Sequence, residues 1–349
     1  MLRTLSLCIS LALGSAAVAQ ECDYKQPTPS ADMIKANEMR KADGSPFGLL
    51  ILLKDITAKE PGNALAWQWR GLAESSAGEV NSAFESLTKA LDIYPCDPLA
   101  RVTRAGFAER LGRLQDAYDD YSYVLARDPK HAYVLRLRGD LLYGAAEFSA
   151  ARADYEAALA TGSEDVDLLL NHGGLMQELG RYRDAIADYE RILKTDSTNE
   201  EALVARGYSR FILGEYAAAE PDLAVGAKIN ANAAAWTFLA RTHMGKPDAN
   251  DQFIYDSQAA KSGDWATYTA GLIKAGAPEE DLMRFAGVDA EKRCNIYFYL
   301  GELSLAKGDR ARAKDLFLKG ADACPKTPAQ TNGSLREYVA MAEELKRMK

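Results

Sequence analysis

The sequence contains few of the side chains that usually carry enzyme chemistry. Its 349 residues include only three histidines, His131, His172 and His243, and none stands at a metal-ligand spacing from another histidine or a cysteine. It also lacks a Gly-x-Ser-x-Gly nucleophile elbow, a phosphate-binding loop and an HExxH motif. We therefore predict a protein without catalytic residues, metal or cofactor, and we interpret the histidines as surface or packing side chains.

Long apolar runs are also missing. After the N-terminal segment, no stretch has the ~20 apolar residues that a membrane helix needs. That segment, MLRTLSLCISLALGSAAVAQ, has a basic Arg3, a short apolar core at 5–13 and Ala-Val-Ala at 17–19, which is the order of a cleaved export signal. Cys22 follows Ala-Gln-Glu, which does not fit a lipid-attachment site. We predict a signal peptide at 1–19 and a periplasmic or secreted mature chain without an integral membrane segment.

Positive charge is in the minority. The formal net charge is −8, and an acidic surface repels the phosphates of nucleic acids and of anionic lipids. A hydrophobic content of 48% with 26% charged residues is typical of a folded chain and excludes general disorder. We therefore expect a protein or peptide partner, and no nucleic acid.

What the chain does contain is a repeat. The stretch GRLQDAYDDYSYVL at 112–125 returns as GRYRDAIADYERIL at 180–193, which is an offset of two 34-residue periods. Five copies keep this register without a gap, at 64–97, 98–131, 132–165, 166–199 and 200–233. Positions are numbered here from the first residue of each copy. Position 8 is always small (Gly71, Ala105, Gly139, Gly173, Gly207), and position 20 is always alanine (Ala83, Ala117, Ala151, Ala185, Ala219).

These positions predict a pair of antiparallel helices, A and B, in each copy. The small residues at positions 8 and 20 mark where the two helices approach most closely. A large residue at position 24, such as Tyr121, Tyr155 or Tyr189, is expected to fill the gap to the next copy, and a glycine at position 15 ends helix A. Pro95 and Pro129 at position 32 cannot continue helix B. We interpret all of these residues as packing residues that specify the fold.

The rest of the chain follows the period less closely. Residues 20–29 form a short N-terminal arm, and 30–63 are a degenerate copy that we interpret as an N-terminal cap. After 233 the register slips, and 234–293 are predicted to be an irregular helical segment with a divergent copy. A good copy returns at 294–327. The amphipathic residues 328–349 predict a C-terminal capping helix.

The period and its small residues resemble the tetratricopeptide repeat family. The resemblance implies an all-α fold, an α-solenoid in which antiparallel helix pairs form a superhelix closed by the capping helix. The C-terminal third, with Trp265, Cys294 before YFYLGELSLAKGD, Phe317, Cys324-Pro325 and the closing EYVAMAEEL, resembles the new-lipoprotein-I type of envelope tetratricopeptide proteins. That resemblance implies an adaptor that holds envelope proteases or peptidoglycan enzymes together, although the lipidated cysteine of that type is missing here.

A solenoid of this kind predicts where a partner binds. The A helices line a concave groove, and positions 2, 5, 6, 9 and 12 face into it. Such positions give the predicted partner-binding residues: Trp69, Thr103, Tyr133, Arg136, Asp140, Tyr143, Asn171, Gln177, Tyr208 and Tyr299. Aromatic side chains among polar ones suit a peptide or helix, and Trp69, Tyr133 and Tyr208 are the expected anchors. The alternative for each aromatic residue is packing between A helices. For the whole protein, the alternative is a self-associating structural component of an envelope assembly or secretion machine.

The cysteines allow a disulfide prediction. Cys8 leaves with the signal peptide, and the spacing of the remaining four allows three pairings. An oxidising compartment favours disulfides. Cys294 begins helix A and Cys324 ends helix B of one copy, and these ends are neighbours in an antiparallel pair, so we predict the bond Cys294–Cys324. Cys22 and Cys96 form the second predicted pair.

Overall fold

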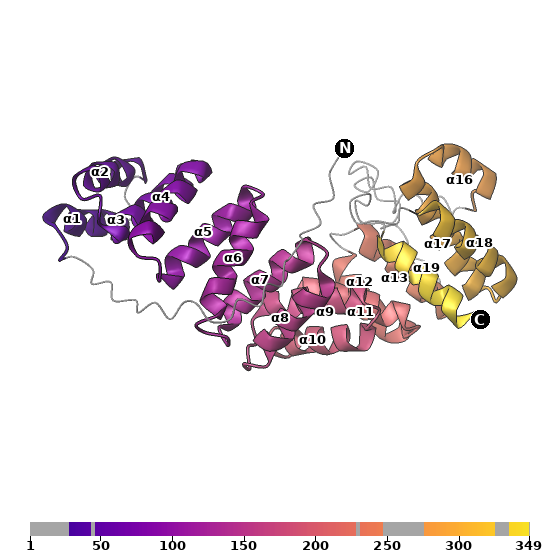
Figure 1. The fold of residues 1–349 in the computed structure, drawn as a ribbon. Coiled ribbons are helices and arrows are strands. Elements are labelled where there is room, and N and C mark those ends of the chain that lie inside the picture. The colour runs from indigo at the N-terminus through magenta and orange to yellow at the C-terminus, as the bar shows by residue number, and fades with distance from the viewer. Residues whose placement is uncertain (1–27, 43–45, 228–230, 247–275, 325–334, 349) are drawn as a thin grey trace. The chain divides into compact units, whose positions relative to one another are not determined.

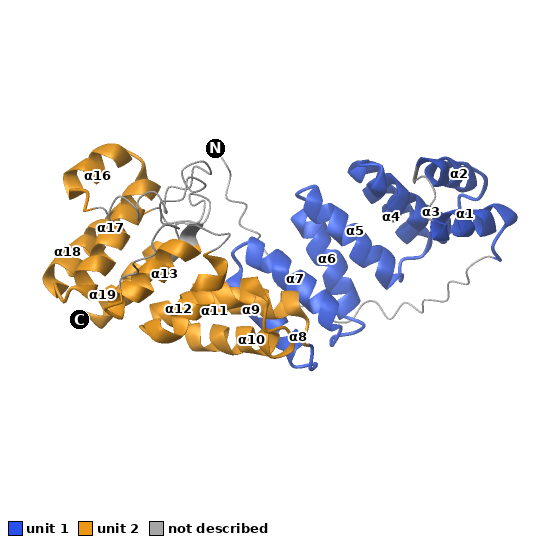
Figure 2. Cartoon of the chain, turned by 180° about the vertical axis from the view of Figure 1, so that it is seen from behind, with its two compact units in different colours: residues 1–163 blue, residues 164–349 orange. Residues whose placement is uncertain are grey.

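The structure is a computed structural model that describes residues 28–42, 46–227, 231–246, 276–324 and 335–348. Within these ranges every regular element is an α-helix, which confirms the predicted all-α fold (Figure 1). The chain divides into two compact units, residues 1–163 and 164–349 (Figure 2). The predicted signal peptide, N-terminal arm, Cys22 and Trp265 lie outside the described residues.

Unit 1 is built from eight described helices. They are α1 (Ala31–Lys41), α2 (Pro46–Lys59), α3 (Ala64–Ser76), α4 (Val80–Ile93), α5 (Pro98–Arg110), α6 (Leu114–Leu125), α7 (Ala132–Gly144) and α8 (Phe148–Leu159). The pairs α3–α4, α5–α6 and α7–α8 each lie within one 34-residue copy, and each pairs an A helix with a B helix.

Unit 2 begins with two further pairs and ends less regularly. Its described helices are α9 (Val166–Glu178), α10 (Tyr182–Thr195), α11 (Glu200–Ile212), α12 (Tyr216–Gly226), α13 (Ala231–His243), α16 (Glu279–Ala286), α17 (Ala290–Ala306), α18 (Arg310–Ala323) and α19 (Leu335–Arg347). Helix α17 begins at Ala290, ahead of the predicted start at Cys294, because the Asp289 carboxylate caps it by accepting from the N–H of Lys292 at 3.0 Å. Residues 247–275 of the predicted irregular segment lie outside the described residues.

The A helices begin and end on local signals. Side-chain oxygens at the preceding residue cap four of them by accepting backbone N–H groups: Asn63, Asp97, Asp165 and Asn199. At the other end, position 15 has positive φ in all five copies. Four copies have glycine there, but the third has Ala146, with φ 62°, which is the one non-glycine residue of positive φ in the described ranges.

In the four copies that have glycine at position 8, the side chain at position 24 packs against this glycine. A Cβ atom added at Gly139 would lie 2.6 Å from Cε1 of Tyr155, and one added at Gly173 would lie 2.6 Å from Cε1 of Tyr189. Both tyrosine rings are buried. We predicted that the side chain at position 24 fills the gap between copies. In the structure its ring instead occupies the space beside the glycine at position 8 of the same copy. A larger residue at position 8 would overlap the ring, so the glycine is required sterically.

An arginine–aspartate contact recurs between positions 7 and 23, and it was not predicted from the sequence. Arg104, Arg138 and Arg206 each donate two hydrogen bonds of 2.7–2.8 Å to a buried aspartate 16 residues later: Asp120, Asp154 and Asp222. These bidentate pairs join helix A to helix B. In the fourth copy the arginine is replaced by His172, whose Nδ1 lies 2.7 Å from Oδ2 of Asp188. These pairs could have been predicted from the sequence, because the arginine and the aspartate recur at fixed positions of the 34-residue period.

The end of unit 2 has a separate aromatic core. Trp236 of α13 is fully buried, and its ring centroid lies 5.0 Å from those of Tyr208 and Phe298. Helix α19 packs against α17 and α18, as expected for a capping helix, and it also contacts α11. Met341 of α19 lies against Gly320 of α18, where a side chain would overlap the Met341 sulfur. The capping helix therefore covers more than the last copy.

The structure contains the predicted bond between Cys294 and Cys324, with both residues buried and 4.7 Å between their Cα atoms. It joins the first turns of α17 to the end of α18. Cys96 is also disulfide-bonded. Because Cys22 lies outside the described residues, the pairing of Cys22 with Cys96 stays a prediction.

Candidate partner-binding face

The candidate site is the face of the A helices that carries positions 2, 5, 6, 9 and 12, here called the A-helix face. In unit 1 it belongs to α3, α5 and α7, and it exposes large apolar side chains: Leu72 is 42% exposed, Leu99 65% and Tyr133 52%. Trp69 is half-buried, with the Arg40 guanidinium 5.0 Å from the centre of its ring. Of the predicted anchors, Tyr133 is therefore accessible and Trp69 partly so.

The charged residues predicted for this face in unit 1 are paired with each other. Arg136 donates to Asp140 at 2.9 Å, and the Tyr155 hydroxyl donates to the other Asp140 oxygen at 2.7 Å. The Arg136 guanidinium also lies 5.3 Å from the centre of the Tyr133 ring. Because Asp140 neutralises Arg136, this part of the face offers a partner the exposed Tyr133 ring, beside an ion pair that carries no net charge.

The other predicted polar residues of unit 1 also make internal contacts. The Thr103 hydroxyl donates to the backbone carbonyl four residues earlier, at 2.7 Å, and the Tyr143 ring centroid lies 5.7 Å from that of Phe148. Nearby, Glu109 accepts a 2.5 Å hydrogen bond from Tyr121. Burial raises the pKa of the Glu109 carboxyl, and the hydrogen bond from Tyr121 opposes that rise.

In unit 2 the A-helix face contains a pocket between α9 and α11, with a volume of about 480 Å³. It is lined by Leu170, Asn171, Gly174, Gln177, Tyr189, Glu200, Glu201, Val204, Ala205 and Gly226. Asn171 and Gln177 were predicted. Five other lining residues also stand at groove positions, and none of them is aromatic: Leu170, Gly174, Glu201, Val204 and Ala205. The pocket exists because Gly174 and Ala205 are small, and a Cβ atom added at Gly174 would meet nothing within 4 Å.

Three polar side chains of this pocket, those of Gln177, Glu200 and Glu201, are available to a ligand as hydrogen-bond acceptors. The Gln177 amide nitrogen donates to the carbonyl of Ala205 at 2.9 Å and to the Ser209 hydroxyl at 2.8 Å, so both of its N–H groups are used. The Gln177 side chain can therefore offer a ligand only its carbonyl oxygen. Glu200 and Glu201 are exposed carboxylates in the first turn of α11. The pocket thus combines an apolar wall with negative charge.

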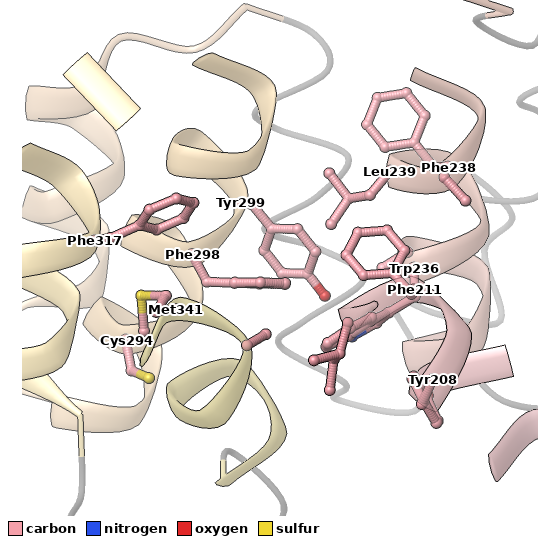
Figure 3. Close-up of a cluster of buried hydrophobic side chains, with 14 of the residues drawn as sticks. Tyr208, Phe211, Trp236, Phe238, Leu239, Cys294, Phe298, Tyr299, Phe317 and Met341 are labelled. Carbon is pink, nitrogen blue, oxygen red and sulfur yellow. The ribbon is translucent and has the colours of Figure 1, made fainter. Parts of the chain in front are cut away.

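Two predicted binding residues are packing residues instead. Tyr208 is 2% exposed and Tyr299 is 1% exposed. Figure 3 shows them in the aromatic core of unit 2, where the Tyr208 ring meets Trp236 edge-on and Tyr299 neighbours Phe298, with ring centroids 5.3 Å apart. The prediction of Tyr208 as an anchor is wrong, because α13 follows α11 and its tryptophan covers this position.

Two of the three histidines, His172 and His243, lie in packing environments. His172 and Asp188 form the buried pair described above, and His243 Nε2 lies 2.8 Å from the buried Glu302 while its ring stacks on Tyr216 at 4.1 Å. In the described ranges, no group of three or more histidine, cysteine, aspartate or glutamate side chains is placed to hold a metal ion. Nor is any described helix long and apolar enough to cross a membrane.

Comparison with known proteins agrees with this geometry. The family model described as tetratricopeptide repeat matches residues 108–166 and 170–235. Among solved structures, Pseudomonas aeruginosa pilF is 19% identical, with a TM-score of 0.52, and the match covers 60% of this chain and 97% of that one. A tetratricopeptide repeat protein from Parabacteroides merdae is 20% identical, with a TM-score of 0.49, and the match covers 80% of this chain and 98% of that one. No curated protein matches the chain.

The matched residues run from α5 to α13 and so span both units. Together with the repeated helix pairs and the glycine contacts at position 8, they show that this part of the chain is built from tetratricopeptide repeats. At these low identities, the likeness to pilF concerns the fold alone. Tetratricopeptide repeats commonly form surfaces that bind other proteins.

Proposed function

We propose that the protein is a non-catalytic adaptor that binds a segment of a partner protein on its A-helix face. The observation that carries this proposal is the location of its accessible features. Leu72, Leu99 and Tyr133 in unit 1, and the pocket beside Gly174 in unit 2, all lie at the groove positions of their copies. Large apolar side chains that are exposed at the groove positions of successive copies are typical of a protein interaction surface.

We further propose that the adaptor works outside the cytoplasm, in the periplasm or after secretion. The order of charge, apolar core and small residues at 1–19 supports export, and a buried disulfide is typical of an oxidising compartment. The resemblance of the C-terminal third to new-lipoprotein-I type proteins favours envelope proteases or peptidoglycan enzymes as clients.

The test is capture of the partner from cross-linked envelopes by a double variant, Leu99→Ser with Tyr133→Ser. Both side chains are largely exposed, so their loss leaves the fold intact, and we expect partner yield to fall at least about fivefold, the equivalent of ~1 kcal/mol. Leu318→Ser on the B helix α18, which is 54% exposed, is the matched control and keeps the yield. Equal yields from both variants would exclude this face as the binding site.

Self-association is the second candidate, and the N-terminal cap provides an observation in its favour. Ile34 of α1, and Phe47 and Ile51 of α2, are 53%, 65% and 71% exposed. Such a surface suits contact with a second copy. Light scattering over a range of concentrations decides between the candidates, because a monomer at all concentrations excludes the self-associating scaffold.

A further inference from the structure

We propose that the pocket between α9 and α11 holds the side chain of an arginine or lysine from the partner segment. This inference rests on the proposed adaptor function and names the chemistry that one part of the face recognises. It depends on the shape of the pocket, the composition of its walls and the sign of the charge at its rim.

The pocket walls suit the aliphatic stem of a long side chain. Leu170 of α9 faces Val204 and Ala205 of α11 across the cavity, and Gly174 and Gly226 add no side chains to it. Its volume of about 480 Å³ falls in the range of ~300–1,000 Å³ that is typical of ligand pockets. Long basic side chains bury their methylene groups along apolar walls and keep the charged end near water, so both parts of such a side chain find a matching environment here.

The rim selects a cation. Among the described residues that line the pocket there are two acids, Glu200 and Glu201, and no base. Gln177 can only accept, as shown above. A partner carboxylate would be repelled, whereas an ammonium or guanidinium group would find carboxylate and amide acceptors.

The two described arginines in the second half of α11 do not neutralise this rim. On α11, Arg206 and Arg210 point to the B-helix side and bind Asp222 at 2.8–2.9 Å, and Arg210 also binds Glu190 at 3.0 Å. The hydrogen bonds to Asp222 raise the pKa of Arg206. Arg206 and Arg210 of α11 are therefore paired with Asp222 of their own copy and, for Arg210, with Glu190 of the preceding copy, and neither pairs with Glu200 or Glu201.

The test uses three capped pentapeptides, Ala-Ala-X-Ala-Ala, in which X is arginine, norleucine or glutamate. Binding to the purified protein is followed by the NMR shifts of the Gly174 and Ala205 amides. We expect the arginine peptide to shift both amides with a Kd of about 1 mM or tighter. Norleucine, which has an apolar stem but no charge, binds at least about fivefold more weakly, the equivalent of ~1 kcal/mol, and glutamate does not bind.

Substitutions in the protein then test whether the arginine peptide binds in this pocket. Gly174→Leu fills the cavity and abolishes the shifts, while Gly106→Leu, at the same repeat position of α5, where an added Cβ atom also meets nothing within 4 Å, leaves them unchanged. Glu200→Gln with Glu201→Gln weakens the arginine peptide about threefold to tenfold and removes most of its salt dependence. Gly174→Ala, which fits without contact, serves as the milder variant if the leucine destabilises the helix.

Three outcomes would overturn the inference: no shift with the arginine peptide, equal affinity for arginine and norleucine, or unchanged affinity in the double glutamine variant. The proposed function is judged separately by partner capture. If capture depends on Leu99 and Tyr133 but not on Gly174 or the two glutamates, the adaptor function stands and the basic anchor is wrong. If capture depends on none of these residues, both proposals fail.

Discussion

The same repeat position has opposite roles in the two units. Position 9 is Leu72 in the first copy of unit 1, where the side chain is 42% exposed, and Tyr208 in the second copy of unit 2, where it is 2% exposed. In unit 2 the chain leaves the 34-residue register after α12, and Trp236 of α13 closes over Tyr208. A groove position is therefore a binding position only where no later helix of the chain packs on it.

The largest expected effect comes from truncating these two side chains. Tyr208→Ala leaves a cavity beneath Trp236 and should lower the free energy of unfolding by about 4 kcal/mol. Leu72→Ala removes a half-exposed side chain from a helix and should cost about 1 kcal/mol or less. Urea unfolding of both variants measures the difference. Similar losses in the two variants would mean that Leu72 is also a core residue.

The interior pairs allow a second comparison, between copies of unit 2. Asp222→Ala leaves Arg206 and Arg210 largely buried without their shared carboxylate, and should cost about 3 kcal/mol. Asp188→Ala leaves only the imidazole of His172 without this partner, whereas a guanidinium always carries a charge, so the expected cost is about 1–2 kcal/mol. Thermal unfolding at neutral pH tests this order. A larger loss for Asp188→Ala would contradict the explanation by charge.

The smallest effect concerns the turn at position 15. Ala146 has φ 62°, a conformation that costs a residue with a Cβ atom about 1 kcal/mol, and glycine occupies the same position in the other four copies. Ala146→Gly should therefore stabilise unit 1 by about 0.5–1 kcal/mol, and Gly180→Ala, with φ 71° in the next copy, should destabilise unit 2 by a similar amount. Paired melting curves check both signs, and a destabilising Ala146→Gly would show that the turn is not strained.

Much of the fold follows from the sequence because the repeat is local. Gly139 and Tyr155 lie 16 residues apart, so a single 34-residue period contains both helices of a pair and predicts the pairing. The period did not predict that the Tyr155 ring packs inside its own copy. The disulfide Cys294–Cys324 follows from the same hairpin geometry. The burial of Tyr208 could not be predicted in this way, because its cover comes from α13, after the register is lost. The pocket was also missed, since its space depends on the small residues Gly174 and Ala205 and not on an aromatic anchor.

The central claim is that partners bind the A-helix face. Photo-cross-linking tests it most directly: benzoylphenylalanine replaces Leu99 and Tyr133 on this face, and the exposed Ala157 and Ala187 on the B helices α8 and α10 as controls. After irradiation of intact cells, we expect one partner band from both A-helix positions and none from the B-helix positions. Cross-links that form only from Ala157 and Ala187 would contradict the account and place the binding surface on the opposite side of the helix pairs.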